Sequence, residues 1–140
     1  MIVFCDTSAL LKLFVEEEHS ESMAVTALAA ESLAVSRLAW AEVMSAIARR
    51  AREMPRDAAA LAKARQAFVD RWPDLVTMEV TQRVVEQAGE YAEAFALRAY
   101  DSMQLATLQT LRLQVDAEVR FACFDSRLRK AATVLSIAGV

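Results

Sequence analysis

The amino-acid sequence predicts an α/β fold built on a mainly parallel sheet. Two apolar runs, residues 2–5 and 121–124, show no alternation of apolar and polar side chains, which is typical of strands buried on both faces. Most segments between them have the apolar spacing of helices, and the chain has 28 Ala but only 2 Gly and 2 Pro. Strands that alternate with helices in this way predict a layered α/β domain.

The N-terminal half of the chain predicts two strands and three helices. After the first strand, the apolar spacing of residues 10–15 predicts a helix that ends in the acidic cluster at 16–18. An Ala-rich segment predicts a helix over residues 20–30, and the apolar triplet 33–35 predicts a short strand. The next helix is expected over residues 38–52. Its apolar stripe consists of Trp40, Val43, Met44, Ile47 and Ala51.

The C-terminal half begins at Pro55, which breaks the preceding helix and suits the first turn of the next, expected to run to residue 72. The second apolar strand stops before Asp125, and residues 134–137 are a candidate last strand, so the sheet has four or five strands. The other expected elements are a turn at 73–74, a strand at 75–80, and helices over 81–96, from Asp101 and from Ser126.

Length and composition predict one folded domain that covers residues 1–140. With 56% hydrophobic and 25% charged residues, the chain lacks the composition of a disordered protein. Sixteen basic and 19 acidic residues leave a net charge of −3, which predicts no general attraction to nucleic acid or to anionic membranes. Uncharged stretches reach only about ten residues and the N-terminus makes a poor signal peptide, so we expect a cytoplasmic protein without a membrane partner.

Histidine and cysteine are scarce, which excludes several kinds of active site. His19 is the only histidine, and at a predicted helix start it is expected to be a surface residue. One histidine excludes His-rich zinc sites, and Cys5 with Cys123 makes neither a disulfide framework nor a Cys-rich zinc site. Any chemistry must therefore use carboxylates, hydroxyls, arginine or lysine.

Three aspartates stand where an apolar segment gives way to a helix: Asp6, Asp101 and Asp125. Aspartate is a favoured N-cap, so each alone is expected to cap a helix, and Asp101 with Gln104 has the spacing of a capping box. Together they indicate more, because Asp6 and Asp125 follow the two most apolar strands, and ligands bind at the carboxyl ends of parallel strands. Clustered carboxylates without His or Cys predict a Mg²⁺ or Mn²⁺ site and phosphoryl chemistry with a metal-activated water.

Four acidic segments follow one another along the chain: residues 6–10 (Asp-Thr-Ser-Ala-Leu), 41–43 (Ala-Glu-Val), 97–106 and 121–128. In order and spacing, they resemble the motifs of the PIN-domain nucleases, in particular the VapC-type toxins of bacterial toxin–antitoxin pairs. The resemblance covers the whole chain. Two departures concern the backbone. The family often has Gly in the loop before its third acid and soon after its last helix, where this chain has Ala96 and delays its Gly to Gly139.

The resemblance implies a PIN-like three-layer fold and metal-dependent cleavage of RNA by the toxin of a type II toxin–antitoxin system. It implies an acidic site of Asp6, Glu42, Asp101 and Asp125, in which the three aspartates hold Mg²⁺ or Mn²⁺. Glu42 rests on the resemblance, because on a helical wheel it lies opposite the apolar stripe, as a solvated residue would. Further contacts to the acids or to substrate are implied for Ser8, Ser126 and Arg127. The implied partners are RNA, a small antitoxin and a second copy of the chain in a homodimer.

Two basic segments are candidates for RNA contact, because phosphate contacts dominate affinity for nucleic acids. Residues 127–130 begin two residues after Asp125, and we favour them as the substrate-facing segment. The other segment is either an RNA surface or a set of ordinary solvated helix faces. It contains Arg49, Arg50, Arg52, Arg56, Lys63, Arg65 and Arg71. Neither segment has interleaved aromatic residues for base stacking, so no sequence-specific recognition is predicted.

Two other functions stay open at this point. A PIN-like module with weak catalysis would act through protein contacts, and a metal-binding measurement separates it from a nuclease. An Asp-based phosphotransfer protein also clusters aspartates at strand ends but generally needs a nearby lysine. Lys12 and Lys63 lie in predicted helices, and Lys130 follows Asp125 too closely. The larger apolar residues either fill the core or form an exposed patch for a partner. They are Met23, Met44, Met54 and Trp40.

Overall fold

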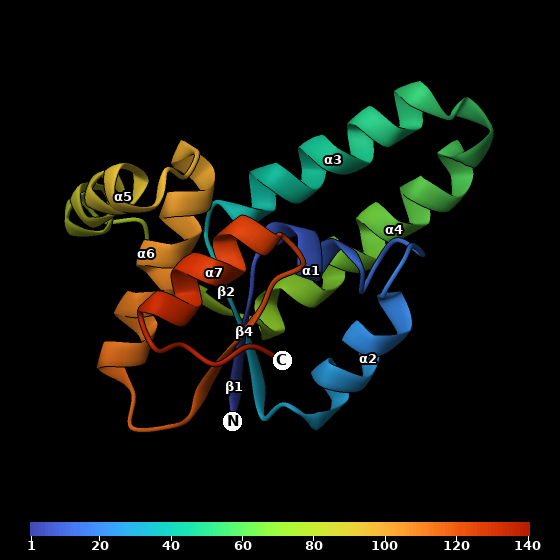
Figure 1. Cartoon of the computed structure of the whole chain (residues 1–140). Coiled ribbons are helices and arrows are strands. Elements are labelled where there is room, and N and C mark those ends of the chain that lie inside the picture. Colours follow the sequence, from blue (N-terminus) through green and yellow to red (C-terminus); the bar gives the residue numbers. More distant parts are fainter.

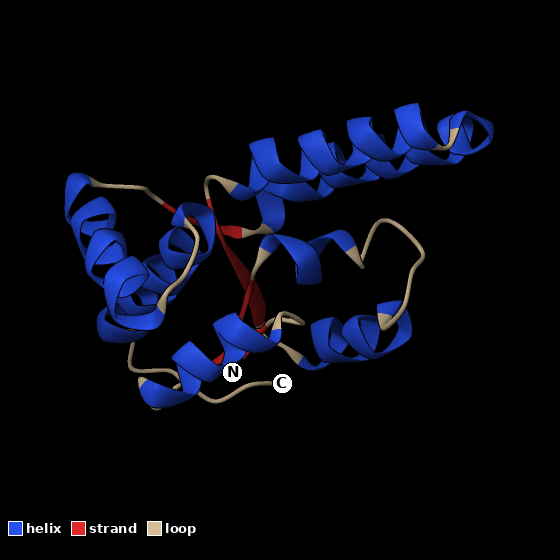
Figure 2. Cartoon of the chain, turned by 45° about the horizontal axis from the view of Figure 1, so that its top comes forward, coloured by secondary structure: helices blue, strands red, loops and turns tan.

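A four-stranded parallel sheet lies at the centre of the computed structural model, which describes all 140 residues. The strands are β1 (Ile2–Cys5), β2 (Ser32–Ser36), β3 (Val76–Met78) and β4 (Val119–Ala122). Their order is β3-β2-β1-β4, so the first and last strands of the chain are neighbours. Figure 2 shows the strands between helices on both sides.

Seven helices surround the sheet, and none combines the length and apolar character needed to span a bilayer. In Figure 1, α3 and α4 form a long pair that projects away from the sheet, and α5 lies beside α6. Two short 3₁₀ helices, Pro55–Asp57 and Trp72–Asp74, flank α4. The seven helices are α1 (Thr7–Leu11), α2 (Ser20–Ala29), α3 (Ala39–Glu53), α4 (Ala58–Arg71), α5 (Gln82–Phe95), α6 (Ala99–Gln114) and α7 (Ser126–Val134).

The core has two layers, because alternate side chains of each strand point to opposite faces of the sheet. Val3 and Cys5 of β1 pack with apolar residues of α1 to α4 on one face, and Phe4 packs with residues of α6 and α7 on the other. All three side chains are fully buried, as expected for a strand without alternation. The predicted three-layer α/β fold is therefore confirmed, with four strands.

Two predicted elements differ from those observed. The helix expected over residues 10–15 is instead α1, which begins at Thr7 and ends at Leu11. Beyond Leu11 the chain continues in turns, in which the Leu13 N–H donates to the carbonyl of Leu10 and the Phe14 N–H to that of Leu11. The apolar residues of this segment therefore keep a helix-like spacing although the helix has ended. The candidate strand at 134–137 is wrong, because α7 runs to Val134 and the C-terminus adds only one isolated bridge to β4.

Other boundaries shift by a few residues. Strand β4 ends at Ala122, so the predicted run 121–124 is half strand and half loop, and β3 covers only three of the six residues expected at 75–80. Of the large apolar residues, Met23 is buried in the core, whereas Trp40 is 36% and Met54 41% exposed. Of the two alternatives for these residues, Met23 therefore belongs to the core, whereas Trp40 and Met54 are partly exposed.

Both backbone departures from the family pattern lie close to a left-handed residue. Ala96 ends α5 with φ of 52°, and Ser136, two residues beyond α7, has φ of 58°. In Ala96 this conformation lets the N–H groups of Ala96 and Leu97 both donate to the carbonyl of Ala92. A left-handed conformation strains any residue with a Cβ atom, and glycine adopts it freely.

We expect Ala96→Gly to raise the free energy of unfolding by about 1 kcal/mol, because it relieves the left-handed strain at the end of α5. Urea unfolding measures the change. The matched control is Ala94→Gly inside the same helix, which should lower stability by about 1 kcal/mol because glycine disfavours ordinary helical backbone. A loss of stability in both variants would contradict the assignment of strain to Ala96.

Candidate active site

Asp6 and Asp125 come together because the strands before them are neighbours. The N–H of Asp6 donates to the carbonyl of Ala122 at 3.1 Å, which ties the ends of β1 and β4 to each other. Strand order reverses between these two strands, since β2 and β3 lie on the other side of β1. Such a switch point is where ligands bind in open parallel sheets.

Both of these aspartates also cap helices, as the sequence predicts. Asp6 is the N-cap of α1, and its Oδ1 accepts hydrogen bonds from the Ala9 N–H and the Ser8 hydroxyl, each at 2.8 Å. The Oδ1 of Asp125, the N-cap of α7, accepts from the Leu128 N–H at 2.8 Å. These bonds occupy one oxygen of each carboxylate and fix its orientation. Capping and ligand binding are therefore compatible at both positions.

Asp101 is different, and the predicted cap and capping box are wrong. Helix α6 begins two residues earlier, at Ala99, with Arg98 as an extended N-cap residue and no side-chain cap. Asp101 is therefore the third residue of the helix. Gln104 turns instead toward other elements, and its amide nitrogen donates to the Thr7 hydroxyl at 3.2 Å and to Glu42 Oε1 at 3.0 Å.

All four candidate acids line one cavity of about 520 Å³: Asp6, Glu42, Asp101 and Asp125. They come from four different segments, namely the start of α1, the first turn of α3, the first turn of α6 and the start of α7. Ser8 also lines this acidic cavity, where it donates to Asp6. The other two residues predicted to contact the acids or the substrate, Ser126 and Arg127, do not line this cavity.

Burial and repulsion between carboxylates disfavour the charged form of three of these acids, Asp6, Glu42 and Asp101. Burial raises the pKa of Asp6, which is only 5% exposed, and the charge of Asp101 raises it further. Burial also raises the pKa of Glu42, with smaller contributions from Asp101 and Asp6. For Asp101, burial and the charge of Asp125 raise the pKa, partly offset by Arg98 and Arg127. Asp6, Glu42 and Asp101 therefore each respond to the charge of at least one other carboxylate of the cavity.

The chemistry of this donor set fits a hard divalent cation. Oxygen-only ligands select Mg²⁺ or Mn²⁺ over zinc, and a bound cation offsets the burial and the repulsion that raise these pKa values. In the present arrangement no three acidic, His or Cys side chains lie close enough to hold one ion together. Binding would therefore require the carboxylates to draw closer around the ion.

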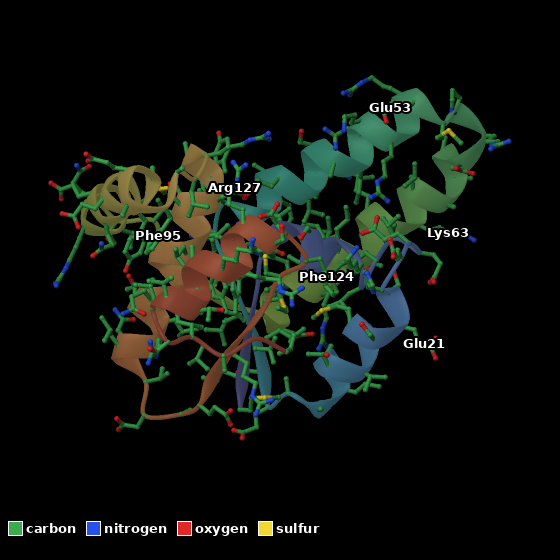
Figure 3. All side chains as sticks on the ribbon, in the orientation of Figure 1. Glu21, Glu53, Lys63, Phe95, Phe124 and Arg127 are labelled. Atoms are coloured by element: carbon green, nitrogen blue, oxygen red, sulfur yellow. The ribbon has the colours of Figure 1, made fainter.

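Arginines complete the wall of the acidic cavity, and only part of the predicted basic segments contributes. Arg49, Arg50 and Arg98 line it. Arg50 is bound to Glu17, which also accepts a hydrogen bond from Lys12, whereas Arg49 and Arg98 pair with no carboxylate. In Figure 3, Lys63 lies on the part of the α3–α4 pair that projects away from the sheet, and Arg127 lies at the start of α7. Of residues 127–130, Arg127 acts on the site through its charge on Asp101.

Sequence reasoning missed three residues of the site. Gln104 was assigned to a cap, although it is buried and bonds Glu42. Cys123 is buried, its thiol donates to the backbone carbonyl of Asp125 at 3.6 Å, and the thiol lowers the pKa of Asp6. Arg98 directly precedes α6, and its charge acts on Asp101. All three lie within the acidic segments that resemble the family motifs, Arg98 and Gln104 in 97–106 and Cys123 in 121–128, and this position was their only signal in the sequence.

None of the three lysines lines the acidic cavity, so the phosphotransfer interpretation lacks the cation it needs. Lys12 is bound to Glu17 and lies over the ring of Phe124, with Nζ 4.9 Å from the ring centre. His19 stacks on Phe124, with the ring centres 5.0 Å apart, and is half exposed. The predicted surface location of His19 is thus confirmed, although one face of the ring is covered.

Comparison with known proteins gives a consistent family. The PIN domain family matches residues 3–134 of the chain. Ribonuclease VapC46 of Mycobacterium tuberculosis is 35% identical over 136 residues, which cover 97% of this chain and 94% of that protein. Ribonuclease VapC45 of the same species is 32% identical over 131 residues, which cover 94% of this chain and 89% of that protein.

Solved structures show the same fold at lower sequence identity. The toxin VapC20 of Mycobacterium tuberculosis, described as cleaving the sarcin–ricin loop, superimposes with a TM-score of 0.67 and 17% identity, over 92% of this chain and 94% of that one. A toxin–antitoxin complex from Klebsiella pneumoniae gives a TM-score of 0.64 and 18% identity, over 89% of this chain and 87% of that one.

Proposed function

The chain belongs to the PIN-domain family, and on this basis we propose that it is a Mg²⁺- or Mn²⁺-dependent endoribonuclease, the toxin of a toxin–antitoxin pair. The observation that carries the proposal is the convergence of Asp6, Glu42, Asp101 and Asp125 on one cavity at the switch point of a parallel sheet. Relatives that cover nearly the whole chain are named ribonucleases, which supports the same activity here.

The three aspartates are the residues that would hold the metal. When bound there, the ion supplies an activated water for hydrolysis of a phosphodiester and neutralises charge on the phosphate oxygens. Asp6 is held in place by the Ala9 N–H, and Asp125 by the Leu128 N–H. Glu42 is oriented by the amide of Gln104, which leaves its second oxygen for a water or an ion.

Arg49 and Arg98 are suited to bind the phosphates that flank the reacting bond. Each lines the acidic cavity, and neither is neutralised by a carboxylate of its own. A guanidinium can form two parallel hydrogen bonds to one phosphate. RNA would thus be held by the arginines around the rim of the acidic cavity, although the net charge of the chain is −3.

The partners of the proposed toxin are a small antitoxin and a second copy of the chain. Exposed apolar side chains support a protein partner, with Val25 64% and Leu28 88% exposed on α2. Leu28 also lines an apolar groove of about 460 Å³ together with Leu13 and Phe14. We place the protein in the cytoplasm, where its RNA substrate is made.

We expect cleavage of single-stranded RNA in the presence of Mg²⁺ or Mn²⁺, and loss of all cleavage in excess EDTA. No histidine lines the acidic cavity that could act as a general base in place of a metal-bound water, since His19 lies outside it. Millimolar Mg²⁺ should also raise the melting temperature, because a ligand that binds only the folded state stabilises it. Returning Mg²⁺ in excess over EDTA should restore the rate.

Contaminating nucleases are controlled for with an Asp101→Asn protein purified in the same way. Metal dependence would be rejected if the unaltered protein cleaved RNA undiminished in EDTA while the Asp101→Asn protein did not cleave it. Metal binding without any cleavage of RNA would instead favour the module that acts only through protein contacts.

A further inference from the structure

A second cavity, of about 430 Å³, adjoins the acidic cavity along α3. The two share the side chains of Glu42, Ala46 and Arg49 in their walls. Beyond these, the second cavity is lined by Leu38, Ala41, Ser45 and Tyr100. A polymer bound across the acidic cavity would therefore reach this second cavity next.

Tyr100 gives the second cavity its chemical character. It is the second residue of α6 and directly precedes Asp101. Its side chain is 62% exposed, more than any other aromatic side chain of the chain, and its ring contacts no other aromatic ring. An aromatic ring left open to water at the wall of a cavity is a surface on which a flat ligand can stack.

We propose that this cavity binds an unpaired base of the RNA substrate, next to the cleaved phosphodiester, with the base stacked on Tyr100. The proposal rests on the proposed nuclease function. Bases that are not paired commonly stack on aromatic side chains, and the cavity is lined on one side by the apolar Leu38 and Ala41. Ser45 and Arg49 provide hydrogen-bonding groups for the polar edge of a base.

Arg49 connects the two cavities. Because its side chain lines both and pairs with no carboxylate, it can bind the phosphate that joins the stacked base to the cleaved bond. The ring of Tyr100 and the carboxylate of Asp101 are carried by adjacent residues of one helix. Stacking would thus set the position of the RNA backbone over the acids. Tyr100 then selects single-stranded RNA over duplex, in which bases are already stacked.

The test uses a single-stranded RNA oligonucleotide that the unaltered protein cleaves at one position with Mg²⁺. We expect Tyr100→Ala to lower kcat/KM about tenfold to a hundredfold, as loss of one base–aromatic contact does, and Tyr100→Phe to stay within about twofold. The matched control is Leu113→Ala, at the other end of α6 and 76% exposed, which should leave kcat/KM unchanged. The melting temperature of Tyr100→Ala should equal that of the unaltered protein.

A scan with abasic ribose identifies the base. In the unaltered protein, one abasic position near the cleaved bond should lower kcat/KM by the same factor as Tyr100→Ala. In Tyr100→Ala, that position should have no further effect. If Tyr100 acted only on Asp101, or only bound a protein partner, the scan would be the same in both proteins, and this result would overturn the proposal. No cleavage of any RNA by the unaltered protein would reject the nuclease function itself.

Discussion

Replacing Asp101 by Asn is expected to slow RNA cleavage at least about a hundredfold, since removal of one charge-stabilising group commonly has an effect of this size. The metal-free variant should be as stable as the original protein or more stable. Asp101 caps no helix, and burial together with the charge of Asp125 raises its pKa, so its charge is unfavourable in the folded state without metal. Asn keeps the shape but lacks the charge that holds a divalent ion.

Three measurements on Asp101→Asn check this expectation: a cleavage rate, a melting temperature without metal, and its increase on adding Mg²⁺. The increase should be smaller than in the unaltered protein. The matched control is Asp116→Asn, an exposed aspartate in the loop before β4, which should change none of the three. A variant that cleaves RNA at nearly the original rate would remove Asp101 from the site.

Asp6 should separate capping from catalysis, because it has both roles in this structure. Asp6→Asn is expected to cleave RNA at least about a hundredfold more slowly yet remain stable, since Asn caps a helix about as well as Asp. Asp6→Ala should be as inactive and also less stable than Asp6→Asn, by about 0.5–2 kcal/mol, because the Ala9 N–H and the Ser8 hydroxyl lose their acceptor.

Urea unfolding without metal gives the difference between the two variants, and a single-turnover rate gives the activity. Equal stability of Asp6→Asn and Asp6→Ala would show that the cap of α1 contributes little. A rate for Asp6→Asn close to that of the unaltered protein would place the chemistry elsewhere in the acidic cavity.

Much of the fold and three of the four acids could be predicted because they depend on local sequence. Residues 2–5 must be buried on both faces, so Asp6 is the first residue that can emerge at the carboxyl edge of the sheet. The same reasoning placed Asp125 after the last strand. Glu42 came from the resemblance to the family, because its helical position alone matches that of a solvated residue.

The errors have local causes as well. Asp101 and Gln104 have the spacing of a capping box, but α6 had already begun at Ala99, and Gln104 found Thr7 and Glu42 instead. Residues 134–137 are apolar, as a strand would be, yet α7 extends to Val134 and Ser136 turns the chain with a positive φ. In each case a short pattern fitted two conformations, and contacts with distant residues decided between them.

The sequence by itself determined the α/β class, the helices and strands in their order, and the places where aspartates leave buried strands. Burial and backbone hydrogen bonding act over a few residues and leave their periodicity in the chain. Only the tertiary structure decided which side chains meet across the cavities: Gln104 with Glu42, Arg49 beside the acids, and Tyr100 over the second cavity. Those contacts depend on how α3 and α6 are rotated and packed against the sheet, and the spacing of residues within either helix does not specify this.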